Sequence, residues 1–412
     1  MTYALEPPET VAMSAARLKR IGPAMQAYVD RGVYAGVSTL VARRGKIVHA
    51  GEYGWRDKEA KAPMTADTIF RLYSMTKPIV CTALMTLLEE GKCSLVDSVA
   101  KYIPAFSAVK VLEDDALLVD PKRPMNLRDL MSHMSGLVYH FLGDSEVSRM
   151  YDGAKLFDAK VPLADAIDDL ARFPLAFQPG TKWKYSVGID VAARVIEVVS
   201  GKSLGHFLQE RLFGPLGMSD TGFAVASEKR GRVAAMYGRP DLTSPGVTAA
   251  TQLAAWAKGV NDNVDVSASY PVDSPDTFQR GGHGLFSTTG DYFRFAQMLC
   301  NGGELGKERV IGRKTLELMH ANHVPAKLLP LEIGGLPLPG YGFGVGSRVA
   351  MDVALTLAPG SVGEYGWSGA AKTHYWVDPK EEIVALFMTQ SMMSFDLPEL
   401  DLRALVYQAL ED

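Results

Sequence analysis

Ser74 and Lys77 are the residues whose types and spacing best suit covalent chemistry. They belong to the run Ser74-Met75-Thr76-Lys77, and apolar residues at 80, 84, 87 and 88 predict a buried helix that starts at Ser74 and ends near Gly91. Residues three apart share a helix face, so the Lys77 amine is expected within reach of the Ser74 hydroxyl. A serine hydroxyl attacks a carbonyl once a neighbouring base takes its proton, and burial would lower the pKa of Lys77 toward neutrality. The run therefore predicts a serine nucleophile with a lysine base; the plain alternative is a helix-capping serine beside a solvated lysine.

Tyr185 is the next candidate for proton transfer. It stands directly before an apolar helix expected at residues 191–199. As a phenolate, or as a hydrogen-bonded relay, it could share the base role and later protonate a leaving alcohol. The alternative is an ordinary half-buried aromatic residue.

A third segment, Tyr365-Gly366-Trp367-Ser368-Gly369-Ala370-Ala371, precedes a strand expected at residues 373–377. Its small residues would let the strand edge approach a ligand closely, and the N–H of Ala370 could join that of Ser74 in an oxyanion hole. The alternative is a glycine-rich turn that leads into an edge strand.

Together these three motifs, S-x-x-K, Y-S-x and W-x-G, resemble those of the family VIII carboxylesterases, which share their fold with class C β-lactamases and DD-peptidases. Their order and spacing match across nearly the whole chain, and residues 127–137 and 281–288 are also similar to that superfamily. The resemblance implies an α+β fold, in which helices flank a central antiparallel sheet and a mostly helical domain is inserted.

The resemblance also implies the roles of the site residues. The nucleophile would be Ser74, the coupled base Lys77 and Tyr185, and the substrate-binding residues Trp367, Gly369 and Ala370. Two positions depart from the β-lactamase pattern, since Val187 replaces an asparagine and Trp367 replaces the lysine of K-T-G. Both losses favour neutral esters over anionic lactams or peptides.

Both ends of the chain carry the elements that would position these residues. A helix from Ser14 precedes a hairpin at residues 37–42 and 46–50, and a second hairpin at 373–377 and 383–389 precedes a C-terminal helix. The pattern predicts a sheet domain of residues 1–92 and 285–412. Residues 93–284 would form the helical domain, with an irregular loop at 238–280 that covers or shapes a pocket.

Composition excludes several classes of function. With 43 basic against 47 acidic residues in 412 and no basic cluster, nucleic acid is not expected as a partner. No apolar run is long enough to span a membrane, no secretory signal begins the chain, and three scattered cysteines indicate a reduced, cytoplasmic protein. Among eight histidines only His320 and His323 are spaced as a helical pair, so neither a metal nor a cofactor is expected.

Other residues could be mistaken for catalytic ones. The motif Gly201-Lys202-Ser203-Leu204-Gly205 has the form of an α/β-hydrolase nucleophile elbow, but a helix precedes it, so Gly201 is expected to end that helix and Ser203 to cap the next. His133 and His283 are expected to be hydrogen-bonded structural residues. Asp291 is expected to cap a helix at residues 292–299.

The sequence thus predicts a serine carboxylesterase that acts on small or short-chain esters through an acyl-enzyme. A β-lactamase, a D-amino-acid peptidase or an acyltransferase could use the same site, and a sensor domain could be acylated without turnover. The only partner expected is a small ester, and the oligomeric state stays open.

Overall fold

An antiparallel sheet of eight strands organises the computed structural model, which describes residues 3–113, 117–143, 145–241, 247, 262–273, 276–392 and 397–412. The strand order is β13-β14-β15-β16-β17-β1-β2-β3. The bounds are β13 Tyr341–Phe343, β14 Arg348–Ala350, β15 Tyr365–Ser368, β16 His374–Asp378, β17 Ile383–Met388, β1 Gly36–Arg43, β2 Lys46–Asp57 and β3 Ala62–Pro63.

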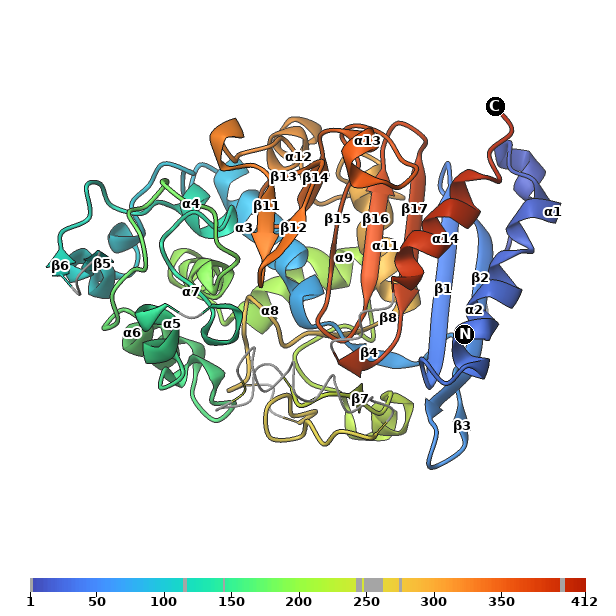
Figure 1. The fold of residues 1–412 in the computed structure, drawn as a ribbon, viewed down its shortest axis with the longest axis horizontal. Coiled ribbons are helices and arrows are strands. Elements are labelled where there is room, and N and C mark those ends of the chain that lie inside the picture. Colours follow the sequence, from blue (N-terminus) through green and yellow to red (C-terminus); the bar gives the residue numbers. More distant parts are fainter. Residues whose placement is uncertain are drawn as a thin grey trace.

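The two ends of the chain meet in the middle of this sheet. Strand β1 pairs with β17, so Ser38 lies opposite Met388 and Arg43 opposite Ile383. Strands β1 and β2, like β16 and β17, form the hairpins expected from the sequence. The predicted central antiparallel sheet flanked by helices is confirmed, and Figure 1 shows its blue and red strands side by side.

Helices from both termini cover one face of the sheet. They are α1 Ala15–Leu18, α2 Ile21–Asp30 and α14 Pro398–Tyr407, and Met25, Leu402 and Val406 form a buried cluster with Trp376 and Phe387 of the sheet. The single helix expected from Ser14 is therefore two helices.

Helix α11 Thr289–Cys300 covers the opposite face, behind β16 and β17. The expectation that Asp291 caps this helix is wrong, because the side chain of Thr288 accepts the hydrogen bond from the Asp291 N–H at 3.1 Å. Asp291 lies in the first turn, and its carboxylate accepts from the backbone N–H of Asp220 at 2.7 Å. A threonine and an aspartate three residues apart can each cap a helix start, so the sequence pattern alone did not choose between them.

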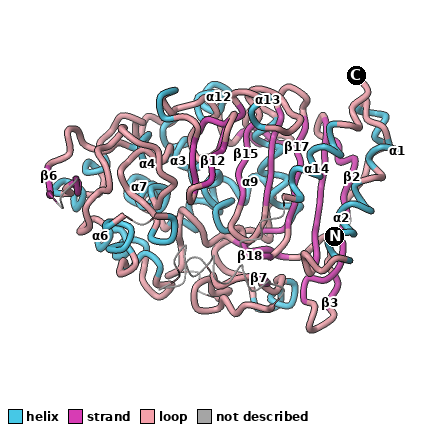
Figure 2. The backbone as a smooth tube through the Cα atoms, viewed as in Figure 1, coloured by secondary structure: helices cyan, strands magenta, loops and turns pink. Residues whose placement is uncertain are grey.

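A mostly helical region lies beyond the β13 edge of the sheet (Figures 1 and 2). Its helices are α4 Leu127–Met131, α5 Glu146–Tyr151, α6 Leu163–Leu170 and α7 Gly188–Ser200. The chain then continues through α8 Leu204–Leu208, a π-helical turn Gln209–Phe213 and α9 Gly214–Leu216, which lies behind the sheet next to α11. One apolar cluster runs from the sheet through α3 Thr76–Glu89 into this region. The division at residues 92 and 284 stays a prediction, because the core is continuous across it.

Short elements connect these layers. They include β4 Ile69–Arg71 paired with β8 Phe286–Thr288, the hairpin β11 Leu331–Ile333 and β12 Leu336–Leu338, β7 Tyr237–Gly238 paired with β18 Ser391–Met392, β5 Val111–Glu113 with β6 Leu117–Val119, β9 Glu304–Leu305 with β10 Glu308–Arg309, and α12 Arg313–Met319 and α13 Val353–Thr356. Residues 242–246, 248–261 and 274–275 of the predicted loop lie outside the described residues. Within the described ranges, no helix has the length and apolar character needed to cross a membrane.

Candidate active site

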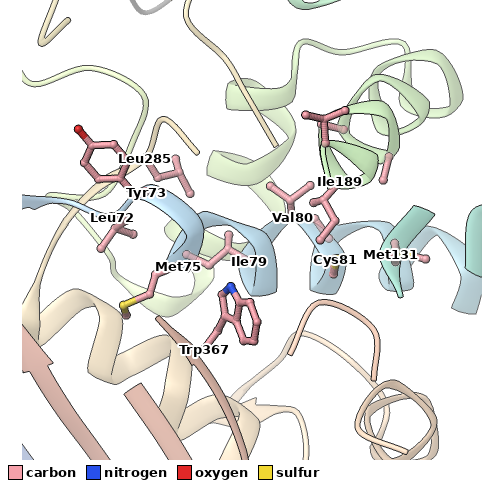
Figure 3. Packing of buried hydrophobic residues seen from close by; sticks show 14 of the residues in the cluster. Leu72, Tyr73, Met75, Ile79, Val80, Cys81, Met131, Ile189, Leu285 and Trp367 are labelled. Atoms are coloured by element: carbon pink, nitrogen blue, oxygen red, sulfur yellow. The ribbon is translucent and has the colours of Figure 1, made fainter. Parts of the chain in front are cut away.

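Ser74 lies in a tight turn between strand β4 and helix α3. The turn Tyr73–Met75 is 3-10 helical, and α3 continues from Thr76. Figure 3 shows Met75 and Ile79 on the side of Trp367, while Val80 faces Ile189 of α7. Because apolar contacts hold α3 on both sides, Ser74 has a rigid support.

The residue before Ser74 has an unusual backbone conformation. Tyr73 has a φ of 46°, a left-handed value that costs a bulky residue about 1–3 kcal/mol. Its hydroxyl donates to the Asp241 carboxylate at 3.1 Å, and its ring packs against Tyr270 with centroids 4.8 Å apart. These contacts offset the cost and hold the turn that presents Ser74.

Lys77 is fully buried one turn from Ser74. Its Nζ lies 3.0 Å from Ser74 Oγ and donates to the Gly282 carbonyl oxygen at 2.7 Å. Burial lowers the pKa of Lys77 to about 7, although the charge of Asp190 opposes that shift. At neutral pH a large share of the amine is therefore uncharged and able to accept a proton.

Tyr185 completes a triangle with these two residues. Its hydroxyl accepts from Trp367 Nε1 at 3.2 Å, and Lys77 Nζ lies 4.7 Å from the centre of its ring. The nearby Ser74 side chain favours the ionised phenol and so lowers the pKa of Tyr185, against the larger effect of burial. Burial raises the pKa of Tyr185, so the phenol is protonated at neutral pH. Of the two forms considered for Tyr185, this favours the hydrogen-bonded relay over the phenolate.

His133 supports Tyr185 from behind. The two rings lie 4.6 Å apart, edge to face, and His133 Nδ1 accepts from the backbone N–H of Ser186 at 3.2 Å. His283 differs from expectation, since neither ring nitrogen has a hydrogen-bond partner among the described residues. Burial and the charge of Lys77 lower the pKa of both histidines, which are therefore neutral.

Asp190 is a site residue that the sequence reasoning missed. It is fully buried in the first turn of α7, where its Oδ1 accepts from the Gly282 N–H at 2.8 Å. A side chain at position 282 would meet Asp190 Oδ2 at 2.4 Å, so only glycine fits there. An aspartate inside the apolar run Ile189-Asp190-Val191 was the available signal, because a carboxylate is rarely buried without a partner.

These residues face a cavity of about 260 Å³. It is lined by Tyr73, Ser74, Tyr139, Phe141, Leu142, Tyr185, Gly282, His283, Ile333, Leu338, Arg348, Trp367, Ser368 and Ala370. Of the predicted substrate-binding residues, Trp367 and Ala370 therefore reach the cavity wall. Gly369 is not among the lining residues, and a side chain there would meet the Leu72 carbonyl oxygen at 2.3 Å. Its role in this structure is to let the end of β15 approach the Tyr73–Met75 turn closely.

Ser203 has the structural role expected for it. Gly201 ends α7 with a φ of 68°, and the Ser203 side chain caps α8 by accepting from the His206 N–H at 3.4 Å. It therefore belongs to a helix cap and not to a nucleophile elbow.

Comparisons with known proteins show the family to which the chain belongs. A family model described as Beta-lactamase matches residues 23–409. The chain is 30% identical over 409 residues to Esterase EstB of Burkholderia gladioli, and the alignment covers 95% of both proteins. It is similar in structure to EstCE1, a hydrolase with promiscuous acyltransferase activity, with a TM-score of 0.78, 26% identity and coverage of 95% of this chain and 99% of EstCE1. A family VIII carboxylesterase has the same fold, with a TM-score of 0.72 at 22% identity over 97% of this chain and 99% of its own. The chain therefore belongs to the Beta-lactamase family and is a serine hydrolase.

Proposed function

We propose that this enzyme hydrolyses small carboxylic esters through an acyl-enzyme on Ser74. The observation that carries the proposal is the 3.0 Å separation of Lys77 Nζ and Ser74 Oγ, together with a lysine pKa of about 7. A neutral Lys77 can donate to the Gly282 carbonyl and still use its lone pair to accept the Ser74 proton.

Acylation begins when the Ser74 hydroxyl loses its proton to Lys77 and Oγ bonds to the ester carbonyl carbon. The backbone N–H groups of Ser74 and Ala370 stabilise the oxyanion that forms. The bond to the alkoxide then breaks, and Tyr185 passes the proton from Lys77 to the departing alcohol. Water attacks the acyl-enzyme by the same proton route in reverse, which releases the carboxylic acid and restores Ser74.

The cavity supports a preference for short acyl chains. Its volume of about 260 Å³ is below the range typical of drug-sized ligands. Aromatic and aliphatic side chains dominate the wall, and Ile333 and Leu338 of the β11–β12 hairpin contribute to it. The loop at 238–280 was expected to cover or shape a pocket, but the described part of that loop contributes none of the lining residues.

Acyl transfer is the second activity that an observation favours. The mostly apolar wall would hold an alcohol that competes with water for the acyl-enzyme, and EstCE1, at 26% identity, is a hydrolase with promiscuous acyltransferase activity. The yield of transesterified product with added alcohol, measured against the yield of free acid, separates transfer from hydrolysis.

Covalent labelling tests the proposed nucleophile. A fluorophosphonate should modify Ser74, as mapped by mass spectrometry of the labelled peptide, and Ser74→Ala should lose both label and esterase activity. Ser203→Ala is the matched control and should retain both. Labelling at Ser203 would overturn the assignment. An acyl group from a substrate ester that stays on Ser74 in stoichiometric amount would instead indicate a sensor domain.

A further inference from the structure

A second cavity lies between the C-terminal end of helix α11, helix α12 and the start of strand β15. Its volume is about 360 Å³, against about 260 Å³ for the cavity that contains Ser74. Among the described residues, none lines both cavities. The second cavity is therefore a separate site, and the proposed reaction makes no use of it.

Tyr365 provides a hydrogen-bond donor on the wall of this cavity. The side chain is only 4% exposed, and its hydroxyl has no hydrogen-bond partner among the described residues. Burial raises the pKa of Tyr365, so the phenol keeps its proton. A buried tyrosine hydroxyl usually has a partner, since an unpaired polar group is costly away from water. The protein leaves this donor for something else to bind.

His320 provides an acceptor on a ring that stacks on Tyr365. The two ring centroids are 3.4 Å apart, with 15° between the planes. His320 Nδ1 lies 3.1 Å from the Leu316 carbonyl oxygen, which can only accept, so Nδ1 carries the proton and Nε2 is left as an acceptor. Nε2 has no partner among the described residues, and burial lowers the pKa of His320 to about 3, so the ring is neutral.

The other lining residues make the site neutral and largely apolar. Leu299, Leu316 and Pro379 contribute apolar surface. Burial raises the pKa of the Cys300 thiol to about 12, so it stays protonated. Of the described lining residues only Arg313 and Glu317 are charged, and these exposed side chains form an ion pair with each other. A charged ligand would therefore lose its hydration without gaining a counterion.

We propose that this cavity binds a small neutral alcohol or phenol, a molecule with an apolar body and one hydroxyl group. A hydroxyl both accepts and donates, so it can accept from the Tyr365 hydroxyl and donate to His320 Nε2. The apolar body fills the space between α11 and α12, and a volume of about 360 Å³ lies within the range of small-molecule sites. The inference does not depend on the proposed esterase activity.

Crystals of the full chain soaked with para-bromobenzyl alcohol test where the probe binds. The anomalous signal of bromine should appear in the cavity between α11 and α12, with the alcohol oxygen within hydrogen-bond distance of Tyr365 and His320. Bromine that appears only in the cavity of Ser74, or in neither cavity, would overturn the proposal.

Titrations in solution test the chemistry of recognition. The methyl NMR signals of isotope-labelled Leu299 and Leu316, which line the cavity, report the Kd of this site alone. The Kd of para-bromobenzyl alcohol should be about tenfold lower than that of para-bromotoluene, which lacks the hydroxyl. Ionised para-bromobenzoate should also bind at least about tenfold more weakly than the alcohol, because no cation in the cavity is free to pair with it.

Substitutions assign this preference to the proposed hydrogen bonds. Tyr365→Phe removes only the hydroxyl, so it should raise the Kd of the alcohol by about tenfold and leave that of para-bromotoluene unchanged. Unchanged binding of para-bromotoluene also shows that the variant has kept its cavity. Tyr341→Phe removes a hydroxyl from β13, outside both cavities, and should change neither Kd.

Three results would overturn the proposal in solution. The alcohol and para-bromotoluene could bind equally well, the preference for the alcohol could survive Tyr365→Phe, or none of the three probes could shift the methyl signals. The last result would mean that the cavity holds only water.

Discussion

Replacing Lys77 by methionine should stabilise the folded protein at neutral pH, although it removes the proposed base. Methionine retains a long unbranched chain and so fills the buried space without a charge. The pKa of Lys77 falls from 10.5 to about 7 on folding. Between these values the unfolded chain binds one proton more than the folded chain, so the stability of the wild type rises with pH across this window.

The size of the effect follows from the two pKa values. At pH 7 the buried lysine costs the folded state about 4 kcal/mol, and at pH 9 the cost falls to about 2 kcal/mol. The variant also loses the hydrogen bonds at 3.0 Å and 2.7 Å and leaves the Gly282 carbonyl oxygen unpaired. This loss costs the folded variant about 1–3 kcal/mol and so offsets part of the gain from removing the lysine. We therefore expect Lys77→Met to be more stable by about 2 kcal/mol at pH 7 and roughly equal to the wild type at pH 9.

Urea unfolding followed by tryptophan fluorescence at pH 7, 8 and 9 measures this difference. The pH dependence is the informative quantity, because the loss of hydrogen bonds is the same at each pH. Repeating the comparison in an Asp190→Asn background excludes any contribution from a change in the ionisation of the neighbouring, buried Asp190 carboxylate. A difference between variant and wild type that does not change with pH would refute a lowered lysine pKa, and with it the proposed base.

Three further predictions concern the same site and its surroundings. kcat/KM should rise with pH through about 7 as Lys77 loses its proton. Asp190→Asn should shift this rise to lower pH, because it removes the negative charge that favours the lysine cation. A pH profile that Asp190→Asn leaves unchanged contradicts the effect of Asp190 on the pKa of Lys77. Asp241→Asn and Tyr73→Phe should each lower kcat more than they change KM, because the hydrogen bond between these two residues, which holds the turn that presents Ser74, is weakened or lost. An unchanged kcat contradicts this role of the hydrogen bond. Ser203→Ala should lower the free energy of unfolding by about 1 kcal/mol through loss of a helix cap, with no change in kcat/KM.

Local geometry made part of the site predictable from the sequence. Ser74 and Lys77 are three residues apart on one helix, so their contact follows from helix periodicity alone. The hairpins at both ends follow from alternating apolar residues and turn residues within short stretches. The Asp190 contact joins α7 to Gly282, 92 positions away in the chain. No local pattern encodes a contact of this kind, which depends on how α7 packs against the segment after the irregular loop.

Arg348 shows why a motif alone described the chemistry of the pocket incompletely. Trp367 in place of a lysine leaves β15 without a cation, and the expected preference for neutral esters assumed that no other strand supplies one. In the structure, β14 pairs with β15 so that Arg348 lies opposite Gly366, which brings a guanidinium to the same end of the sheet. Neighbouring strands together determine the charge of a binding site. The pairing of the strands therefore has to be known before the loss of a lysine from one motif can be taken to mean that the site has no cation.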